Sequence, residues 1–138
     1  MKASQKYLIV LTNVTIKSRN MNDNNLNLEL KSVRQLKVSR EVTATHLPIG
    51  HSFIPYDILL VVANTHMSKK PLTIKSLFAS LPYSDMGTRY HFNHLKNNGW
   101  IELVTDKNDS RNKLCKPSKK FHSKIRMIAK ELEAIGQL

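Results

Sequence analysis

Apolar positions in the N-terminal third of the chain recur at helical spacing. The recurring residues stand at i, i+4, i+7 and i+10: Leu26, Leu30, Val33 and Leu36. Lysine and arginine occupy the other faces, so the apolar stripe is narrow and is typical of a helix edge that faces a partner. The helix should end within His46–Gly50, where proline and glycine interrupt it, and we assign residues 26–50 to this N-terminal helical segment with a dimerisation role.

An Asn-rich section precedes this helix. Residues 20–25 read Asn-Met-Asn-Asp-Asn-Asn, a composition that favours turns and predicts a linker. We assign residues 1–25 to an N-terminal arm, whose first part is compatible with a short strand or with an unstructured leader.

Two further helices are predicted in the middle of the chain. The first begins at Ser52–Pro55, where proline is tolerated in the first turn, and it is apolar nearly all round through Ala63. It should therefore be the most buried element. The second is capped by Thr73. Its apolar stripe consists of Ile74, Leu77, Phe78 and Leu81.

A break at Leu81–Tyr83 leads into the next helix, which is predicted over residues 84–98. Ser84 is a strong N-cap residue, and Asp85 in the first turn suits the positive end of the helix dipole. The inward stripe consists of Thr88, Phe92 and Leu95. Gly99 should end the helix in a left-handed conformation. Two helices joined by a short break have helix-turn-helix spacing.

The period of the pattern changes after Gly99. Residues 100–105 alternate as a strand does, Asp106–Ser110 supply turn chemistry, and residues 111–116 can return as a second strand. Ser118 then caps a last helix, in which apolar residues recur at intervals of four and three. These residues are Phe121, Ile125, Ile128, Leu132 and Ile135.

The order of the predicted elements is that of a winged helix-turn-helix protein, mainly α with a small β-hairpin and so of the α+β class. Residues 51–117 form the expected DNA-binding domain, and residues 118–138 form a C-terminal helix with a second dimerisation role. The apolar stripes of both flanking helices exceed what a single chain of 138 residues should bury. We therefore expect a homodimer built from these two helices.

The charge of the chain narrows the class of partner. The sequence has 22 Lys and Arg against 10 Asp and Glu, which gives a net charge of +12. This surplus favours a polyanion, either nucleic acid or an anionic membrane surface. The most apolar early run, Tyr7–Leu11, is far shorter than the about 20 residues that span a bilayer. We therefore expect no membrane partner, and the positive charge then favours double-stranded DNA. Because Cys115 is the only cysteine, we also expect a reducing compartment and a cytoplasmic location.

The hairpin region resembles the wing of MarR-family transcriptional regulators. The similarity extends over residues 54–121 and rests on three stretches: Gly99–Ile101, the pattern D-x-x-D-x-R at Asp106–Arg111, and Lys116–Ser118. It implies a winged helix that binds DNA and regulates transcription. The chain departs from the family pattern in having one helix after Ser118 and no arginine in residues 102–105. We therefore expect a small regulator similar to that family, with no small-molecule effector indicated by the sequence.

The polar face of the helix over residues 84–98 carries the side chains expected to bind DNA. These are Ser84, Met86, Arg89, Tyr90, Asn93 and His94. A helix fits the major groove of B-DNA, where arginine can bind guanine at two points and asparagine can bind adenine, so we assign these roles to Arg89 and Asn93. Tyr90 is expected at a phosphate or a base, and Ser84 and His94 at phosphates. The alternative is that this face is only a solvated polar surface.

The wing, residues 105–113, is expected in the minor groove. Lys107, Arg111 and Lys113 supply positive charge there, and the family resemblance implies that Arg111 enters the groove. Asp109 lies two residues before Arg111 and can hold its guanidinium in one orientation. The alternative is that Asp106 and Asp109 only build the turn.

No catalytic site, metal site or cofactor is expected. His91 and His94 lie one helical turn apart and Cys115 lies on the neighbouring hairpin, which is a set of metal-ligand types. We expect instead that His91 is a partly buried helix residue and that His94 neighbours a phosphate. His51, Ser52 and Asp57 are close in sequence but lack the elbow motif of a hydrolase.

Three functions remain open on the sequence. The first is a sequence-specific transcriptional regulator. The second is a winged-helix DNA-binding module of mobile-element, replication or conjugation machinery. The third is a winged helix that binds other proteins and whose charge serves solubility.

Overall fold

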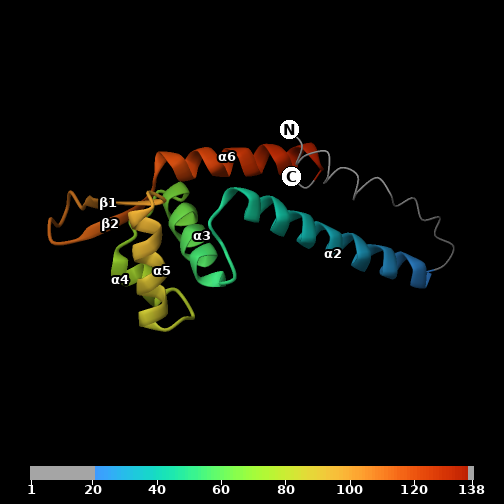
Figure 1. Ribbon diagram of the computed structural model, residues 1–138, viewed down its shortest axis with the longest axis horizontal. Helices are drawn as coiled ribbons and strands as arrows, with labels where there is room; N and C mark the ends of the chain where they lie inside the picture. The colour runs from blue at the N-terminus through green and yellow to red at the C-terminus, as the bar shows by residue number, and fades with distance from the viewer. Residues whose placement is uncertain (1–20, 137–138) are drawn as a thin grey trace. The chain divides into compact units, whose positions relative to one another are not determined.

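The computed structural model describes residues 21–136. Its elements are helix α2 (Met21–His46), helix α3 (Phe53–Met67), helix α4 (Ile74–Ala79), helix α5 (Asp85–Asn97), strand β1 (Ile101–Thr105), strand β2 (Lys113–Pro117) and helix α6 (Lys119–Ala134) (Figure 1). They fall into two compact units. One unit runs from Leu47 to Ile125, and the other joins the residues up to His46 to those from Arg126 onward. The expectations for residues 1–20 lie outside the described residues.

Helix α2 begins earlier than the sequence predicts, and it ends within His46–Gly50, where the sequence predicts its end. The linker expected over residues 20–25 is wrong for residues 21–25, which are helical. Asparagine costs only a few tenths of a kcal/mol in a helix, and extending an existing helix is easier than starting one. At the other end, Pro48 restricts the residue before it to extended backbone. The helix therefore ends at His46 and does not reach Gly50.

The two flanking apolar stripes differ in exposure. The stripe of α2 is exposed: Leu26 by 65 %, Val33 by 62 % and Leu36 by 72 %. The stripe of the C-terminal helix is covered: Phe121 is 0 %, Ile128 9 % and Ile135 7 % exposed. The expectation of an exposed stripe is therefore confirmed for α2 and wrong for the C-terminal helix. Helical spacing identifies the apolar side of a helix, but the burial of that side depends on contacts between distant segments.

One hydrogen bond links α2 to the second half of α6. The Nε2 atom of His46 lies 2.7 Å from Oε1 of Glu131. Both residues belong to the same compact unit, and His46 is only 9 % exposed. This contact ties the end of the N-terminal helix to the C-terminal helix within one chain.

Helix α3 is central to the unit from Leu47 to Ile125. Ile58, Leu59 and Val62 are completely buried, as the apolar run predicts, whereas Phe53 and Leu60 face solvent. Helices α4 and α5 begin at their predicted caps, Thr73 and Ser84, and α3 begins at Ser52, within the predicted start. The side-chain oxygens of Ser52, Thr73 and Ser84 accept the backbone N–H groups of Ile54, Ser76 and Gly87.

The end of α5 fixes where the hairpin begins. Gly99 has a φ of 73°, a left-handed conformation that favours glycine. Its N–H donates to the carbonyl of Lys96, and the N–H of Trp100 donates to the carbonyl of Leu95, at 3.1 and 2.9 Å. This pair of bonds is the Schellman motif, which stops the helix and sends the chain directly into β1.

The wing is a two-stranded antiparallel hairpin. Ile101 pairs with Pro117 and Thr105 pairs with Lys113. The carbonyl of Leu72 accepts the N–H of Cys115 at 2.7 Å, which anchors β2 to the segment before α4. Figure 1 shows the hairpin loop projecting away from the three helices α3, α4 and α5.

This architecture confirms the predicted fold class, mainly α with a small β-hairpin. The helix-turn-helix consists of α4 and α5, and the hairpin follows it as a wing. Within residues 21–136, no helix is both long and apolar enough to cross a membrane.

Candidate nucleic-acid interface

Helix α5 buries one face and displays the other. Thr88, Phe92 and Leu95 are at most 3 % exposed, which confirms the inward stripe. The opposite face carries five of the predicted DNA-contacting side chains in exposed positions: Met86, Arg89, Tyr90, Asn93 and His94. Exposure reaches 83 % for Met86 and 69 % for Tyr90. A helix that keeps large apolar and aromatic side chains in solvent has a face suited to another molecule.

Ser84 lies at the exposed start of this helix. Its Oγ accepts the N–H of Gly87 at 3.2 Å, so the oxygen is engaged in capping. The hydroxyl hydrogen is still able to donate to a phosphate oxygen. Capping and the predicted phosphate contact are therefore compatible.

Arg89 is held by two neighbours, Asp85 and Phe78, that the sequence analysis did not connect with it. Its Nε and Nη2 donate to the carboxylate of Asp85, with the shortest distance 3.1 Å from Nη2 to Oδ2. Its guanidinium carbon lies 5.3 Å from the centroid of the Phe78 ring, in cation–π geometry. Phe78 in turn makes an edge contact with Phe92. The Asp85–Arg89 pair was visible in the sequence at i, i+4, but the contact with Phe78 required the fold.

The turn between α4 and α5 is tied to α3 by one side-chain hydrogen bond. The hydroxyl of Tyr83 donates to Oδ2 of Asp57. This bond raises the pKa of Tyr83 above its ordinary value, with smaller contributions in the same direction from burial and from the charge of Asp57. The bond therefore helps to position the start of the candidate recognition helix.

We expect Tyr83→Phe to lower the midpoint of thermal unfolding at neutral pH, because the Asp57 carboxylate loses its donor. The pKa of Tyr83 is raised in the folded protein, so its stabilising effect is present below the ordinary tyrosine pKa of about 10. That effect is lost as the pH rises through the folded-state pKa. Thermal unfolding of both proteins across alkaline pH measures this. A difference in midpoint that keeps its neutral-pH value as the pH rises through the folded-state pKa would contradict the assignment.

The loop of the wing is organised by two aspartates. Oδ1 of Asp106 accepts the N–H of Asn108 at 2.9 Å, and Oδ1 of Asp109 accepts the N–H of Arg111 at 3.0 Å. The other oxygen of Asp109 accepts Nδ2 of Asn112. No ion pair joins Asp109 to the guanidinium of Arg111 in the described part of the chain. The expectation that Asp109 holds the guanidinium is therefore wrong for this structure, because one of its oxygens holds the backbone N–H of Arg111 and the other holds the side chain of Asn112.

The three basic side chains of the wing are exposed. Lys113 donates from Nζ to Oγ1 of Thr105 at 2.7 Å, which holds its ammonium beside β1. Lys107 and Arg111 form no ion pair with any described residue. Their charge is therefore available to an anionic partner.

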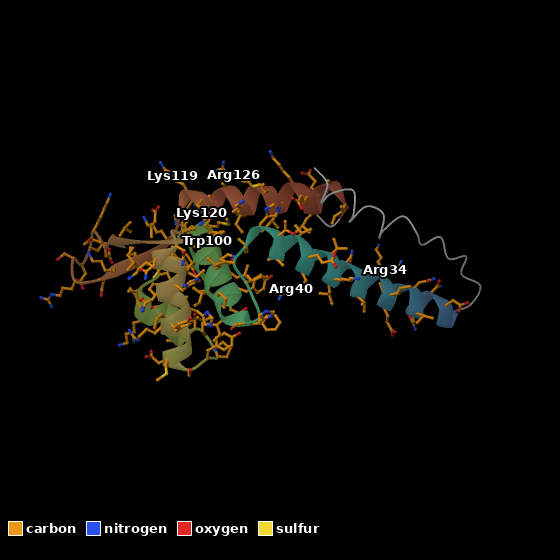
Figure 2. All side chains as sticks on the ribbon, in the orientation of Figure 1. Arg34, Arg40, Trp100, Lys119, Lys120 and Arg126 are labelled. Atoms are coloured by element: carbon orange, nitrogen blue, oxygen red, sulfur yellow. The ribbon has the colours of Figure 1, made fainter. Side chains whose placement is uncertain are left out.

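A cation also fixes the junction between α5 and α6. Lys120 lies over the ring of Trp100, with Nζ 4.3 Å from the ring centroid (Figure 2). The same Nζ donates to the carbonyl of Asn98 at 3.1 Å, where it complements the negative end of the α5 dipole. Sequence spacing gave no indication of this contact.

Histidines gather beside the candidate interface. His51, His91 and His94 line a hollow of about 190 Å³ together with Tyr90. His91 is half-buried and His94 is exposed, as expected. No group of three or more metal-binding side chains is arranged to hold an ion within residues 21–136.

The residues of the alternative chemical sites are engaged elsewhere. Cys115 is 3 % exposed within the hairpin, and burial raises the pKa of its thiol to about 11. Of the proposed hydrolytic set, Ser52 caps α3 and Asp57 accepts the Tyr83 hydroxyl. Neither residue is paired with a histidine in the described structure.

The sequence matches no protein-family model, and no curated protein matches it. Solved structures do match the fold. An S. aureus MepR mutant bound to an oligodeoxyribonucleotide is similar with a TM-score of 0.63 and 10 % identity, over 83 % of this chain and 79 % of that chain. YusO from Bacillus subtilis has a TM-score of 0.56 and 13 % identity, over 86 % of this chain and 81 % of that chain.

A third similar structure is the transcriptional regulator Tm0710 from Thermotoga maritima. It has a TM-score of 0.55 and 16 % identity, over 83 % of this chain and 75 % of that chain. Each similarity covers at least 83 % of this chain and so extends beyond residues 54–121, on which the sequence resemblance rests. The chain has the winged-helix fold of MarR-type transcriptional regulators.

Proposed function

We propose that the protein is a sequence-specific, double-stranded DNA-binding transcriptional regulator. Residues 84–98 lie in the major groove as a recognition helix, and residues 105–113 lie in the adjacent minor groove as a wing. The observation that carries this proposal is the exposed face of α5, where an arginine, a tyrosine and an asparagine stand beside a basic hairpin. The net charge of +12 supports a polyanionic partner.

The proposed roles follow from the chemistry of each side chain. Arg89 binds a guanine at two points and Asn93 binds an adenine, while Tyr90 and Met86 contact neighbouring bases or phosphates. Ser84 and His94 bind phosphates near the two ends of the helix. In the wing, Arg111 enters the minor groove, and Lys107 and Lys113 bind the backbone that flanks it.

The protein acts as a homodimer in this proposal. The exposed stripe of α2, with Leu26, Val33 and Leu36, supplies an apolar surface that a second copy would cover. A two-fold dimer presents two recognition helices and therefore binds an inverted repeat with half-sites about 10 base pairs apart.

Selection from a pool of random duplexes tests the function directly. The full chain should enrich one inverted repeat, and each half-site should contain a guanine that Arg89→Ala no longer selects. Enrichment of no sequence, with binding to every duplex at low salt, would favour a DNA-binding module without promoter specificity. Failure to retain any duplex at low salt would favour a protein-binding winged helix.

The hydrogen bonds of the wing predict how Asp109 acts. Because Asp109 holds the backbone N–H of Arg111, we expect Asp109→Ala to weaken binding to the selected duplex although it removes a negative charge. The same change should be nearly silent when Arg111 is already alanine. A double-mutant cycle at fixed salt measures the coupling.

Asp109→Asn is the matched control for this prediction. An asparagine oxygen can accept the same backbone N–H of Arg111, so this variant keeps that bond. It loses the charge and the acceptor for Nδ2 of Asn112. It should bind the selected duplex at least as tightly as the wild type. Tighter binding by Asp109→Ala, or additive losses in the cycle, would mean that Asp109 does not act through Arg111.

A further inference from the structure

Arg89 is oriented before any DNA is present. The carboxylate of Asp85 accepts from Nε and Nη2 of the guanidinium through three contacts of 3.1 to 3.4 Å, and the Phe78 ring lies against the face of the guanidinium. The pair is largely exposed, by 60 % for the Arg89 side chain and by 69 % for that of Asp85. An exposed ion pair of this spacing contributes little to folding. Stability alone therefore gives no strong reason for the arrangement.

The arrangement leaves one end of the guanidinium available. An arginine carries five N–H groups in a planar fork. Asp85 engages Nε and Nη2, whereas Nη1 makes no hydrogen bond to any residue between 21 and 136. The end of the fork formed by Nη1 and the outer N–H of Nη2 is the edge that can meet O6 and N7 of guanine. Since a flexible arginine loses rotamer freedom when it is fixed, holding it beforehand favours binding that requires this one orientation.

The charge of Asp85 has a second consequence. DNA presents phosphates along both edges of the groove, so a carboxylate on the recognition face opposes binding to any duplex. Only a duplex that presents a guanine to the oriented guanidinium gains a contact that offsets this repulsion. A residue that weakens non-specific binding more than specific binding increases specificity.

From these contacts we infer that Asp85 is a specificity-determining positioning residue. It holds the Arg89 guanidinium against Phe78 so that its free end selects guanine, and its charge disfavours duplexes without that guanine. This inference rests on the proposed function. It adds a residue that acts on DNA through Arg89, not by its own contact with a base.

The test compares two duplexes at fixed salt: the selected duplex, and the same duplex with the guanine assigned to Arg89 replaced. Fluorescence anisotropy with the full chain gives the affinity ratio. Asp85→Ala should lower that ratio about tenfold. Its affinity for the substituted duplex should stay the same or increase. Asp85→Asn is the near-isosteric control for folding. Its one amide oxygen can keep the contacts that Oδ2 makes but not the one to Oδ1, and it has no charge, so it should lower the ratio less than Asp85→Ala does.

The Arg89→Ala background separates positioning from other roles. There, removal of Asp85 should strengthen binding to both duplexes by the same factor and leave the ratio unchanged. An Asp85→Ala protein with an unchanged or higher ratio would overturn the inference while the proposed function stands. Equal weakening of binding to both duplexes would mean that Asp85 only stabilises the helix. Loss of selection at another base pair would mean that Asp85 contacts a base directly. A wild-type protein that binds both duplexes equally would overturn the proposed function itself.

Discussion

Replacing Leu36 with glutamate should convert the protein from a dimer into a monomer. Leu36 is 72 % exposed, on the same side of α2 as Leu26 and Val33, and a carboxylate left unpaired in an apolar interface is costly. Without the second copy, the affinity for an inverted-repeat duplex should fall by about 10²–10⁴, because the two half-sites are no longer bound together. Sedimentation velocity measures the first effect and fluorescence anisotropy the second.

Asn24→Glu is the matched control on the same helix. At 100° per residue, Asn24 stands on the side of α2 opposite the stripe, and it is exposed. Asn24→Glu adds the same charge as Leu36→Glu, and we expect this variant to remain dimeric with the affinity of the wild type. A wild-type protein that sediments as a monomer at micromolar concentration would contradict the dimer, and so would a Leu36→Glu protein that stays dimeric.

Arg89→Ala should weaken binding to the selected duplex by about 1–3 kcal/mol and relax selection at one base pair of each half-site. The physical reason is the loss of a two-point contact that no neighbouring side chain can replace. Binding to random duplexes should change much less. Titrations of both duplexes at the same salt concentration measure the difference.

Lys107→Ala serves as the comparison for a phosphate contact. Lys107 is exposed in the wing loop and forms no ion pair within the described residues. Its removal should weaken all duplexes about equally and reduce the salt slope by about one. If Arg89→Ala behaved in the same way as Lys107→Ala, Arg89 would bind a phosphate and α5 would not read bases through it.

The helix boundaries around the candidate interface could be predicted because they depend on neighbouring residues. The caps Ser84 and Thr73, the inward stripe of α5 and the stop at Gly99 are all local features. Each involves residues no more than a few positions apart. Local chemistry therefore placed helix α5 to within one residue of its observed ends.

Features that depend on tertiary contacts could not be predicted in the same way. Apolar spacing on α2 and α6 looks alike, yet only α2 keeps its stripe exposed. The ring of Phe78 reaches Arg89 only because α4 packs beside α5. The sequence offers the Arg111 guanidinium as a partner for Asp109, but its two oxygens accept the backbone N–H of Arg111 and the side-chain amide of Asn112.

The most direct test of the central claim is the ratio of affinities for the selected duplex and for a shuffled duplex of the same composition. Both are measured for the full chain at one salt concentration, because phosphate contacts alone give strong binding at low salt. The proposed regulator should bind the selected duplex roughly 10³-fold or more tightly than the shuffled one. Affinities that agree within a few-fold would contradict it, since the exposed face of α5 would then not be reading sequence.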